Sequence, residues 1–213
     1  MFKSLSLKVI IFGFIFTFFS SFGQSFFIGL FNPSVRDDLN ISHGQFGSIY
    51  ATATLLSSFL FIWVGKKIDD INVLRFALYV TVLLSFSCFF FSKISSIVFL
   101  FIAIFLMRFS GQGMMSHTAS TTISRYFTKS RGKALSIGWF GLSVAEFILP
   151  VTIIYLLTIY NWQNIWIFIS LLVLVFLPIA SYFLIKELNL DSRENAENNE
   201  VKNKDIKQWA RIE

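Results

Sequence analysis

Six long apolar stretches, separated by short polar segments, constrain this chain more than any other feature of its sequence. A helix needs about 20 apolar residues to cross the roughly 30 Å hydrocarbon core of a bilayer. The runs are continuous and much longer than the ten-residue alternating strands of a membrane β-barrel. The sequence therefore predicts an all-α membrane protein, with a six-helix transmembrane bundle over residues 1–185. The expected spans are roughly 9–31, 46–64, 76–91, 97–122, 134–160 and 165–185.

The composition supports this class of fold. Hydrophobic residues make up 55% of the 213 positions, charged residues only 14%, and the mean hydropathy is +0.68. Soluble domains carry about 25% charged residues, so these values exclude a soluble enzyme and a disordered chain. Cys88 is the single cysteine, which excludes a disulfide scaffold. Residues 186–213 are charged and rich in Asn and Glu, and we expect them to form a solvated tail.

The placement of Lys and Arg predicts the orientation. With the N-terminus inside, fifteen of the 18 basic residues fall on the inner side, two (Arg36 and Lys93) on the outer side, and Arg108 within a span. By the positive-inside rule both termini and the tail are cytoplasmic, in an inner or plasma membrane. The net charge of +6 is thereby explained by topology, so we expect a lipid bilayer and no nucleic acid as partner.

Two short segments carry helix-boundary signals. Asn32-Pro33-Ser34 is expected to end the first helix, because proline cannot continue it. The segment Ser42–Gln45 has the spacing of a capping box and predicts the start of the second helix.

A shift of 88 residues aligns the two halves of the bundle. Gly23-Gln24 then matches Gly111-Gln112, and the second and third spans match the fifth and sixth. Because three spans are an odd number, the second unit must lie inverted in the membrane, as in many transporters. The sequence predicts two inverted three-helix repeats.

Two ionised side chains, Arg108 and Glu146, lie deep within the predicted spans. Each costs about 2.5–3.5 kcal/mol at a helix centre on insertion scales, so neither is expected to face lipid. Counting helix rise from the loop between the fourth and fifth helices places both near the midplane. Two compatible interpretations stay open: a structural ion pair, or a substrate or proton site whose pair opens when substrate or a proton arrives.

Other polar residues follow the same helices. Gln112, Ser116 and Ser120 continue the face of Arg108 at i+4 spacing, and Ser20, Ser21 and Gln24 form a stripe on the first helix. Small hydroxyl residues also suit close helix packing, whereas the two glutamines carry both donors and acceptors. We predict that the substrate binds at Arg108, Gln112, Gln24, Ser20 and Ser21. We predict that Glu146 couples protons to transport.

Chemical motifs of other kinds are not found in the sequence. There is no metal-ligand spacing, phosphate loop or nucleophile constellation, so we expect no catalytic residues, no metal, no cofactor and no enzyme activity. For His117 two roles stay open, a proton carrier or a packed or capping side chain.

Several segments together resemble the N-terminal half of a major facilitator superfamily transporter. Gly65-Lys66-Lys67-Ile68-Asp69-Asp70 is similar to the superfamily's Gly-x-x-x-Asp loop, with Arg75 following. The other segments that carry the resemblance are Arg108–Gly113, Arg125–Leu135, Gly141–Pro150, Phe22–Gln24 and Ser42–Gly44. Together these segments suggest a prokaryotic branch near the monocarboxylate and oxalate porters.

The resemblance implies a fold of twelve helices in two bundles, of which this chain holds six. We therefore expect a truncated product or partial record, completed by a C-terminal six-helix half, or a six-helix protein that pairs with a second copy. Residues 186–213 would correspond to the central loop.

The resemblance also implies secondary active transport of a small solute, an organic anion, by alternating access as symporter or antiporter. Arg108 would attract the anion, Glu146 would couple protons, and Gly65, Asp69 and Arg75 would belong to a gating loop. The alternative is an inactive remnant or an assembly subunit without transport of its own.

Overall fold

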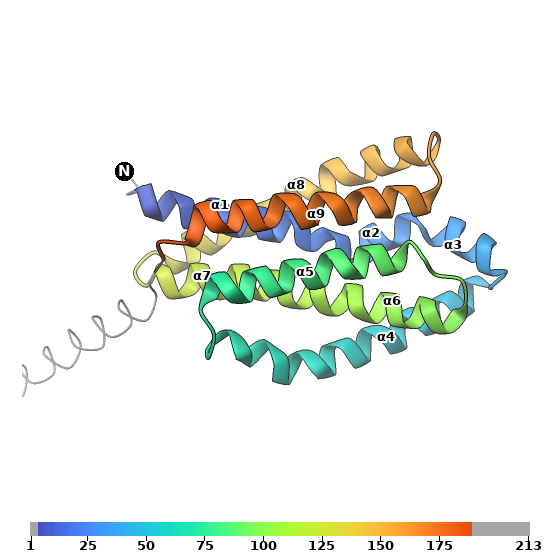
Figure 1. Cartoon of the computed structure of the whole chain (residues 1–213), viewed down its shortest axis with the longest axis horizontal. Coiled ribbons are helices and arrows are strands. Elements are labelled where there is room, and N and C mark those ends of the chain that lie inside the picture. The colour runs from blue at the N-terminus through green and yellow to red at the C-terminus, as the bar shows by residue number, and fades with distance from the viewer. Residues whose placement is uncertain (1–3, 189–213) are drawn as a thin grey trace, which may run out of the picture.

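The computed structural model describes residues 4–188, and within this range every regular element is helical. Six helices are long and apolar enough to cross a membrane, which confirms the predicted all-α, six-helix class. They lie lengthwise beside one another in one elongated bundle (Figure 1). The predicted tail, residues 186–213, lies outside the described residues except for its first three.

Twelve helical segments build the six spans and their connections in the described part of the chain. They are α1 (Ser4–Ser20), η1 (Ser21–Gly23), α2 (Ser25–Leu30), α3 (Asn32–Leu39), α4 (His43–Val64), η2 (Gly65–Ile68), α5 (Val73–Phe91), α6 (Ile97–Met107), η3 (Arg108–Met115), α7 (Ser116–Tyr126), α8 (Arg131–Leu157) and α9 (Trp162–Ile185).

The first predicted span is interrupted partway along its length. After α1 and the short turn η1, Gln24 has extended backbone (φ −82°, ψ 155°), and only then does α2 begin. The expected continuous helix over residues 9–31 is therefore divided. Pro33 lies in the first turn of α3, so the chain bends again near the predicted proline boundary.

The start of the second span agrees with the predicted capping box. The backbone N–H of Gln45 donates to Ser42 Oγ at 3.2 Å, and the Ser42 N–H donates to Gln45 Oε1 at 2.8 Å. These bonds satisfy two donors that a helix start would otherwise leave unpaired.

The fourth span also departs from regular α-helix, at its centre. Between α6 and α7, η3 is a π-helix that runs from Arg108 to Met115. Wide turns of this kind are rare and are frequent at functional sites. Gly111 and Gly113, both within η3, have low intrinsic helix propensity and so favour a local departure from the α-helix.

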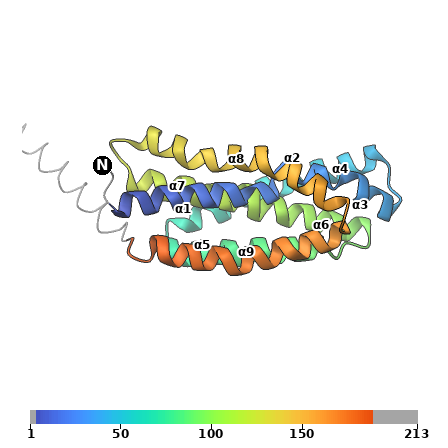
Figure 2. The same cartoon turned by 90° about the horizontal axis from the view of Figure 1, so that it is seen from above.

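The packing of the spans follows a two-fold pattern. α1 packs on α8, α4 packs on α6 and η3, and α5 packs on α9. An exchange of the first three spans with the last three pairs the first span with the fourth, the second with the fifth and the third with the sixth. The contact of α1 (first span) with α8 (fifth span) then becomes the contact of α6 and η3 (fourth span) with α4 (second span). The contact of α5 (third span) with α9 (sixth span) is unchanged by the exchange. Figure 1 shows α9 running along α5, and Figure 2 shows α1 between α9 and α8. This is the arrangement that two inverted repeats require.

Two contacts mark the axis of this pattern, one because its hydrogen bonds are reciprocal and one because it joins residues that the shift aligns. Ser85 Oγ donates to the Ser170 carbonyl and Ser170 Oγ donates to the Ser85 carbonyl, both at 2.9 Å. Gly23 and Gly111, the residues that the 88-residue shift aligns, are packed backbone to backbone: a Cβ on Gly111 would lie 2.7 Å from Gly23 Cα and N. A contact in which each residue makes the same bond to its counterpart is the signature of two-fold symmetry.

Small residues also bring α1 and α8 close together. A Cβ on Gly141 would lie 2.5 Å from Thr17 Oγ1, and that hydroxyl donates to the Gly138 carbonyl at 2.6 Å. Without a hydrophobic force between helices in lipid, such close backbone approach supplies the packing energy. Four of the five buried residues of α8 are accordingly small, namely Ala134, Gly138, Gly141 and Ala145, and the fifth is Ile153.

The Gly23–Gly111 contact yields a stability prediction. Gly111→Ala should lower the free energy of unfolding by about 1–3 kcal/mol, because its methyl group would overlap backbone atoms that cannot rotate away. Gly29→Ala, in α2, is the matched control, since nothing lies within 4 Å of the added methyl group. Thermal unfolding of the detergent-solubilised variants tests this, and equal melting temperatures for the two variants would contradict it.

Candidate functional site

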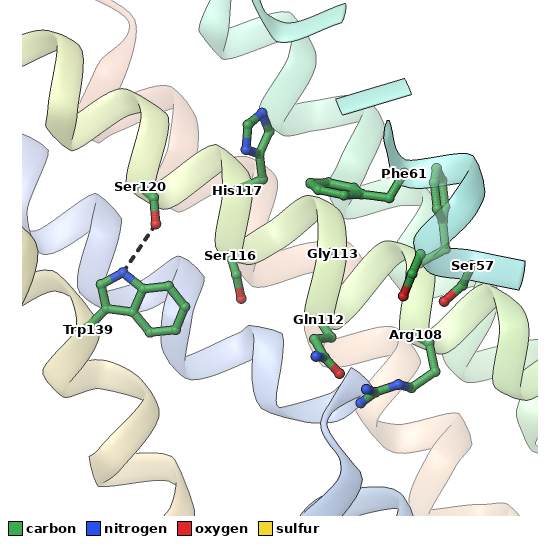
Figure 3. A pocket seen from close by; sticks show the side chains of 11 residues that line it. Ser57, Phe61, Arg108, Gln112, Gly113, Ser116, His117, Ser120 and Trp139 are labelled. Carbon is green, nitrogen blue, oxygen red and sulfur yellow. Dashed lines mark hydrogen bonds between the residues drawn. The ribbon is translucent and has the colours of Figure 1, made fainter. Parts of the chain in front are cut away.

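A partly open cavity of about 350 Å³ lies beside the irregular centre of the fourth span (Figure 3). Its floor is formed by η3 and α7, and its walls by α4 and α8. The lining residues are Ser57, Ser58 and Phe61 of α4; Arg108, Phe109, Gln112, Gly113, Ser116, His117 and Ser120 of the fourth span; and Trp139 of α8.

The polar row predicted on the fourth helix lies along this cavity. Arg108, Gln112, Ser116 and Ser120 all line it. The last residue of the row contacts α8, because Trp139 Nε1 donates to Ser120 Oγ at 3.1 Å. The i+4 spacing therefore places all four side chains on one surface, although the π-helix replaces the expected α-helix over part of the row.

Arg108 is held at the break in the first span. Its Nη1 donates to the Gly23 carbonyl at 3.0 Å and to Ser25 Oγ at 3.4 Å, and its guanidinium carbon lies 5.4 Å from the centre of the Tyr50 ring. The side chain is 8% exposed. Because Gly23 ends a helical segment, its carbonyl is at the negative end of the helix dipole and suits a cation.

The structure does not form the expected pair between Arg108 and Glu146. Glu146 is exposed on α8, and no ion pair joins it to Arg108 within residues 4–188. Arg108 and Glu146 are expected at the same depth in the membrane, but equal depth does not make two side chains point toward each other. α8 turns its glycine and alanine face toward α1, and this rotation directs Glu146 out of the bundle.

The three predicted residues of the first span do not line the cavity. Ser20 and Ser21 are fully buried inside the bundle, and Ser20 Oγ donates to the Thr17 carbonyl at 2.7 Å. Gln24 is half-buried at the chain break. The tight Gly23–Gly111 contact fills the space between the first and fourth spans, so the two glutamines do not share one cavity as expected.

The predicted gating loop is attached to α7 at two points. The Gly65 carbonyl is 3.0 Å from His117 Nε2, and Asp69 forms an ion pair with Arg125. Arg75 is exposed on α5. Since His117 and Arg125 are eight residues apart, they lie on the same face of the helix. The role of this loop in gating stays a prediction.

Sequence reasoning left several of these residues without a role. The sequence indicates Arg125 only as part of a motif, although its two-turn spacing from His117 is a usable signal. The polar wall of α4, Ser57 and Ser58, gave no signal, because hydroxyl residues recur along that helix. Residues 4–188 contain no group of His, Cys, Asp or Glu that could hold a metal ion.

The ion pair at the loop yields a second prediction. Asp69 and Arg125 are 60% and 25% exposed, so their coupling in a double-mutant cycle of Asp69→Asn and Arg125→Gln should be about 0.2–1 kcal/mol and should weaken in high salt. Unfolding in detergent measures it. The matched cycle with Asp70→Asn should show no coupling; equal coupling in the two cycles would refute the assignment.

Comparison with known families identifies what kind of chain carries this cavity. A family model described as Major Facilitator Superfamily matches residues 13–212. The matched range includes the polar row of the fourth span, the cavity walls and the loop that α7 holds. Comparisons with curated proteins and with solved structures found no match.

Proposed function

The chain belongs to the major facilitator superfamily, and on that premise we propose that this membrane transporter carries a small organic anion by alternating access. The family supports transport of a small solute. The anion is the finer proposal, and it depends on one observation, the buried guanidinium of Arg108 in the cavity floor.

A buried cation without a carboxylate beside it favours an anionic ligand. Arg108 is more than nine-tenths buried, and its Nε has no hydrogen-bond partner among the described residues. Ser116 Oγ, in the same cavity, is likewise buried without a partner in that range, and its hydroxyl can donate to an anion. Gln112 Oε1 is also buried without a partner there, but an amide oxygen only accepts, so it would need a donor on the ligand. Unpaired buried polar groups are costly, and a carboxylate would satisfy the planar donors of arginine especially well. The arrangement can therefore bind and desolvate a small carboxylate.

The open side of the cavity supports a second bundle as partner. α4 and α8 flank the floor, and the exposed faces of both carry polar groups, among them Ser58 and Glu146. A carboxylate such as Glu146 is expensive in lipid, so we propose that these faces meet another six-helix unit, whether a C-terminal half or a second copy. Glu146 is two turns beyond Trp139 on α8, and proton coupling there stays a prediction from the sequence.

The proposed orientation, the membrane and the branch of the superfamily depend on the sequence. The excess of Lys and Arg on one side supports a cytoplasmic placement of both termini, in an inner or plasma membrane. The pair Lys8–Glu187, 3.4 Å apart, places the start of α1 and the residues after α9 at the same end of the bundle. The motif pattern supports a branch near the monocarboxylate and oxalate porters.

Substitution of Arg108 tests the proposal directly. In membrane vesicles that contain the full-length protein, Arg108→Ala should lower the uptake of radiolabelled lactate, acetate or oxalate at least about a hundredfold. The basis is the loss of about 3 kcal/mol or more when one partner of a buried charged contact is removed. Lys93→Ala, on the outer loop, is the control and should keep wild-type uptake.

The outcomes separate the candidate functions. Unchanged uptake by Arg108→Ala, at an equal amount of protein in the membrane, would contradict the role of this residue. If the wild type neither binds nor takes up any of the three carboxylates, the proposal fails, and a six-helix unit without transport of its own becomes the better interpretation.

A further inference from the structure

His117 joins the cavity to the loop before α5. Its ring lines the cavity, and the Phe61 ring packs against it nearly at right angles, with centroids 5.3 Å apart (Figure 3). Its Nε2 lies 3.0 Å from the Gly65 carbonyl. A carbonyl oxygen only accepts hydrogen bonds, so Nε2 must carry the hydrogen of the neutral ring.

This tautomer leaves the other ring nitrogen available to accept a proton. Nδ1 of a neutral Nε2–H imidazole carries a lone pair, and within residues 4–188 no hydrogen-bond partner occupies it. The side chain is half-buried at the cavity wall, within reach of a proton from the cavity. A proton on Nδ1 would create a cation without breaking the bond to Gly65, and that bond would become stronger.

We propose that His117 is the residue that couples protons to anion transport, an inference that rests on the proposed function. A proton from water on one side binds Nδ1, and the anion binds at Arg108. After the transporter reopens, the anion leaves and Nδ1 returns the proton to water on the other side. When both sites are occupied, one proton crosses with one monovalent anion, and that cycle is electroneutral.

The size of the coupling follows from the separation of the two sites. His117 is nine residues beyond Arg108 on the fourth span, about 13 Å at the helical rise. At an effective dielectric constant of about 20, one added positive charge at that distance strengthens anion binding about tenfold. Histidine is the side chain whose charge ordinarily changes between pH 5 and 8, so a test of the proposal compares uptake at the two sides of this range.

Apart from Arg108, the other charged groups around His117 are paired or lie on the surface of the bundle. Arg108 is the one other charged residue that lines the cavity in the described part of the chain. On α7, Arg125 is paired with Asp69. The remaining charged residues on the neighbouring elements η2, α5 and α8 are exposed: Lys66, Lys67, Arg75, Arg131, Lys133 and Glu146.

The pH dependence of uptake tests the proposal. In vesicles with the full-length protein, initial uptake of radiolabelled lactate should rise about tenfold between pH 8 and pH 5.5. His117→Gln keeps an N–H donor for the Gly65 carbonyl but cannot take up a proton, so its uptake should not rise between pH 8 and pH 5.5. The matched control is His43→Gln, at the exposed start of α4, which should keep the wild-type profile.

A second measurement needs no variant. In weakly buffered detergent solution near neutral pH, addition of lactate to the wild-type protein should cause proton uptake, because linkage between the two sites is reciprocal. Lactate binding without proton uptake would overturn the proposal even if His117→Gln failed to fold.

The outcomes distinguish this inference from the function on which it depends. A wild-type pH profile in His117→Gln would overturn the role of His117 and leave anion transport intact. A flat profile in Glu146→Gln together with an unchanged one in His117→Gln would assign coupling to Glu146 instead. Absence of carboxylate uptake in the wild type at every pH would refute the proposed function itself.

Discussion

The rest of the structure depends on the contact between the backbones of Gly23 and Gly111. A Cβ on either residue would overlap main-chain atoms of the other span, so a close crossing of the first and fourth spans requires glycine on both. Both spans are irregular at this crossing: the first is broken at Gln24, and the fourth widens into a π-helix. The break frees the carbonyl of Gly23 from helical bonding, and that carbonyl accepts from Arg108. One steric requirement thus creates both the irregular backbone and the polar environment that holds a buried cation.

The same contact lies on the axis that relates the two halves of the bundle. The reciprocal bonds of Ser85 and Ser170 mark a second point on that axis, where α5 crosses α9. Between these points the repeats are equivalent in packing but not in chemistry. The fourth span carries the buried Arg108 and its polar row, whereas the buried residues of the first span include Ser20, Ser21 and several phenylalanines. The cavity is therefore an asymmetric feature on a symmetric framework, and its walls, α4 and α8, are the second helices of the two repeats.

The cavity and the loop before α5 are connected through one helix. His117 contributes to the cavity and bonds to Gly65, and two turns later Arg125 pairs with Asp69. The cavity floor and the loop are therefore joined through α7 itself, without any intermediate element. Arg108 could not serve this connection, because its bonds tie it to the first span.

The sequence predicts those features that depend on residues within a single helix, and it does not predict those that depend on contacts between helices. The length of the apolar runs determined six spans, because bilayer thickness fixes how many residues a helix needs. The capping box at Ser42 and the polar row from Arg108 to Ser120 were equally readable, since both depend on spacing within one helix. The tertiary structure alone decided that Gln24 interrupts its span, that Ser20 and Ser21 are packed away from the cavity, and that Glu146 turns outward from Arg108. These outcomes depend on how each helix is rotated about its axis. That rotation is set by contacts between glycines and backbone far apart in the sequence, which no pattern within a single helix encodes.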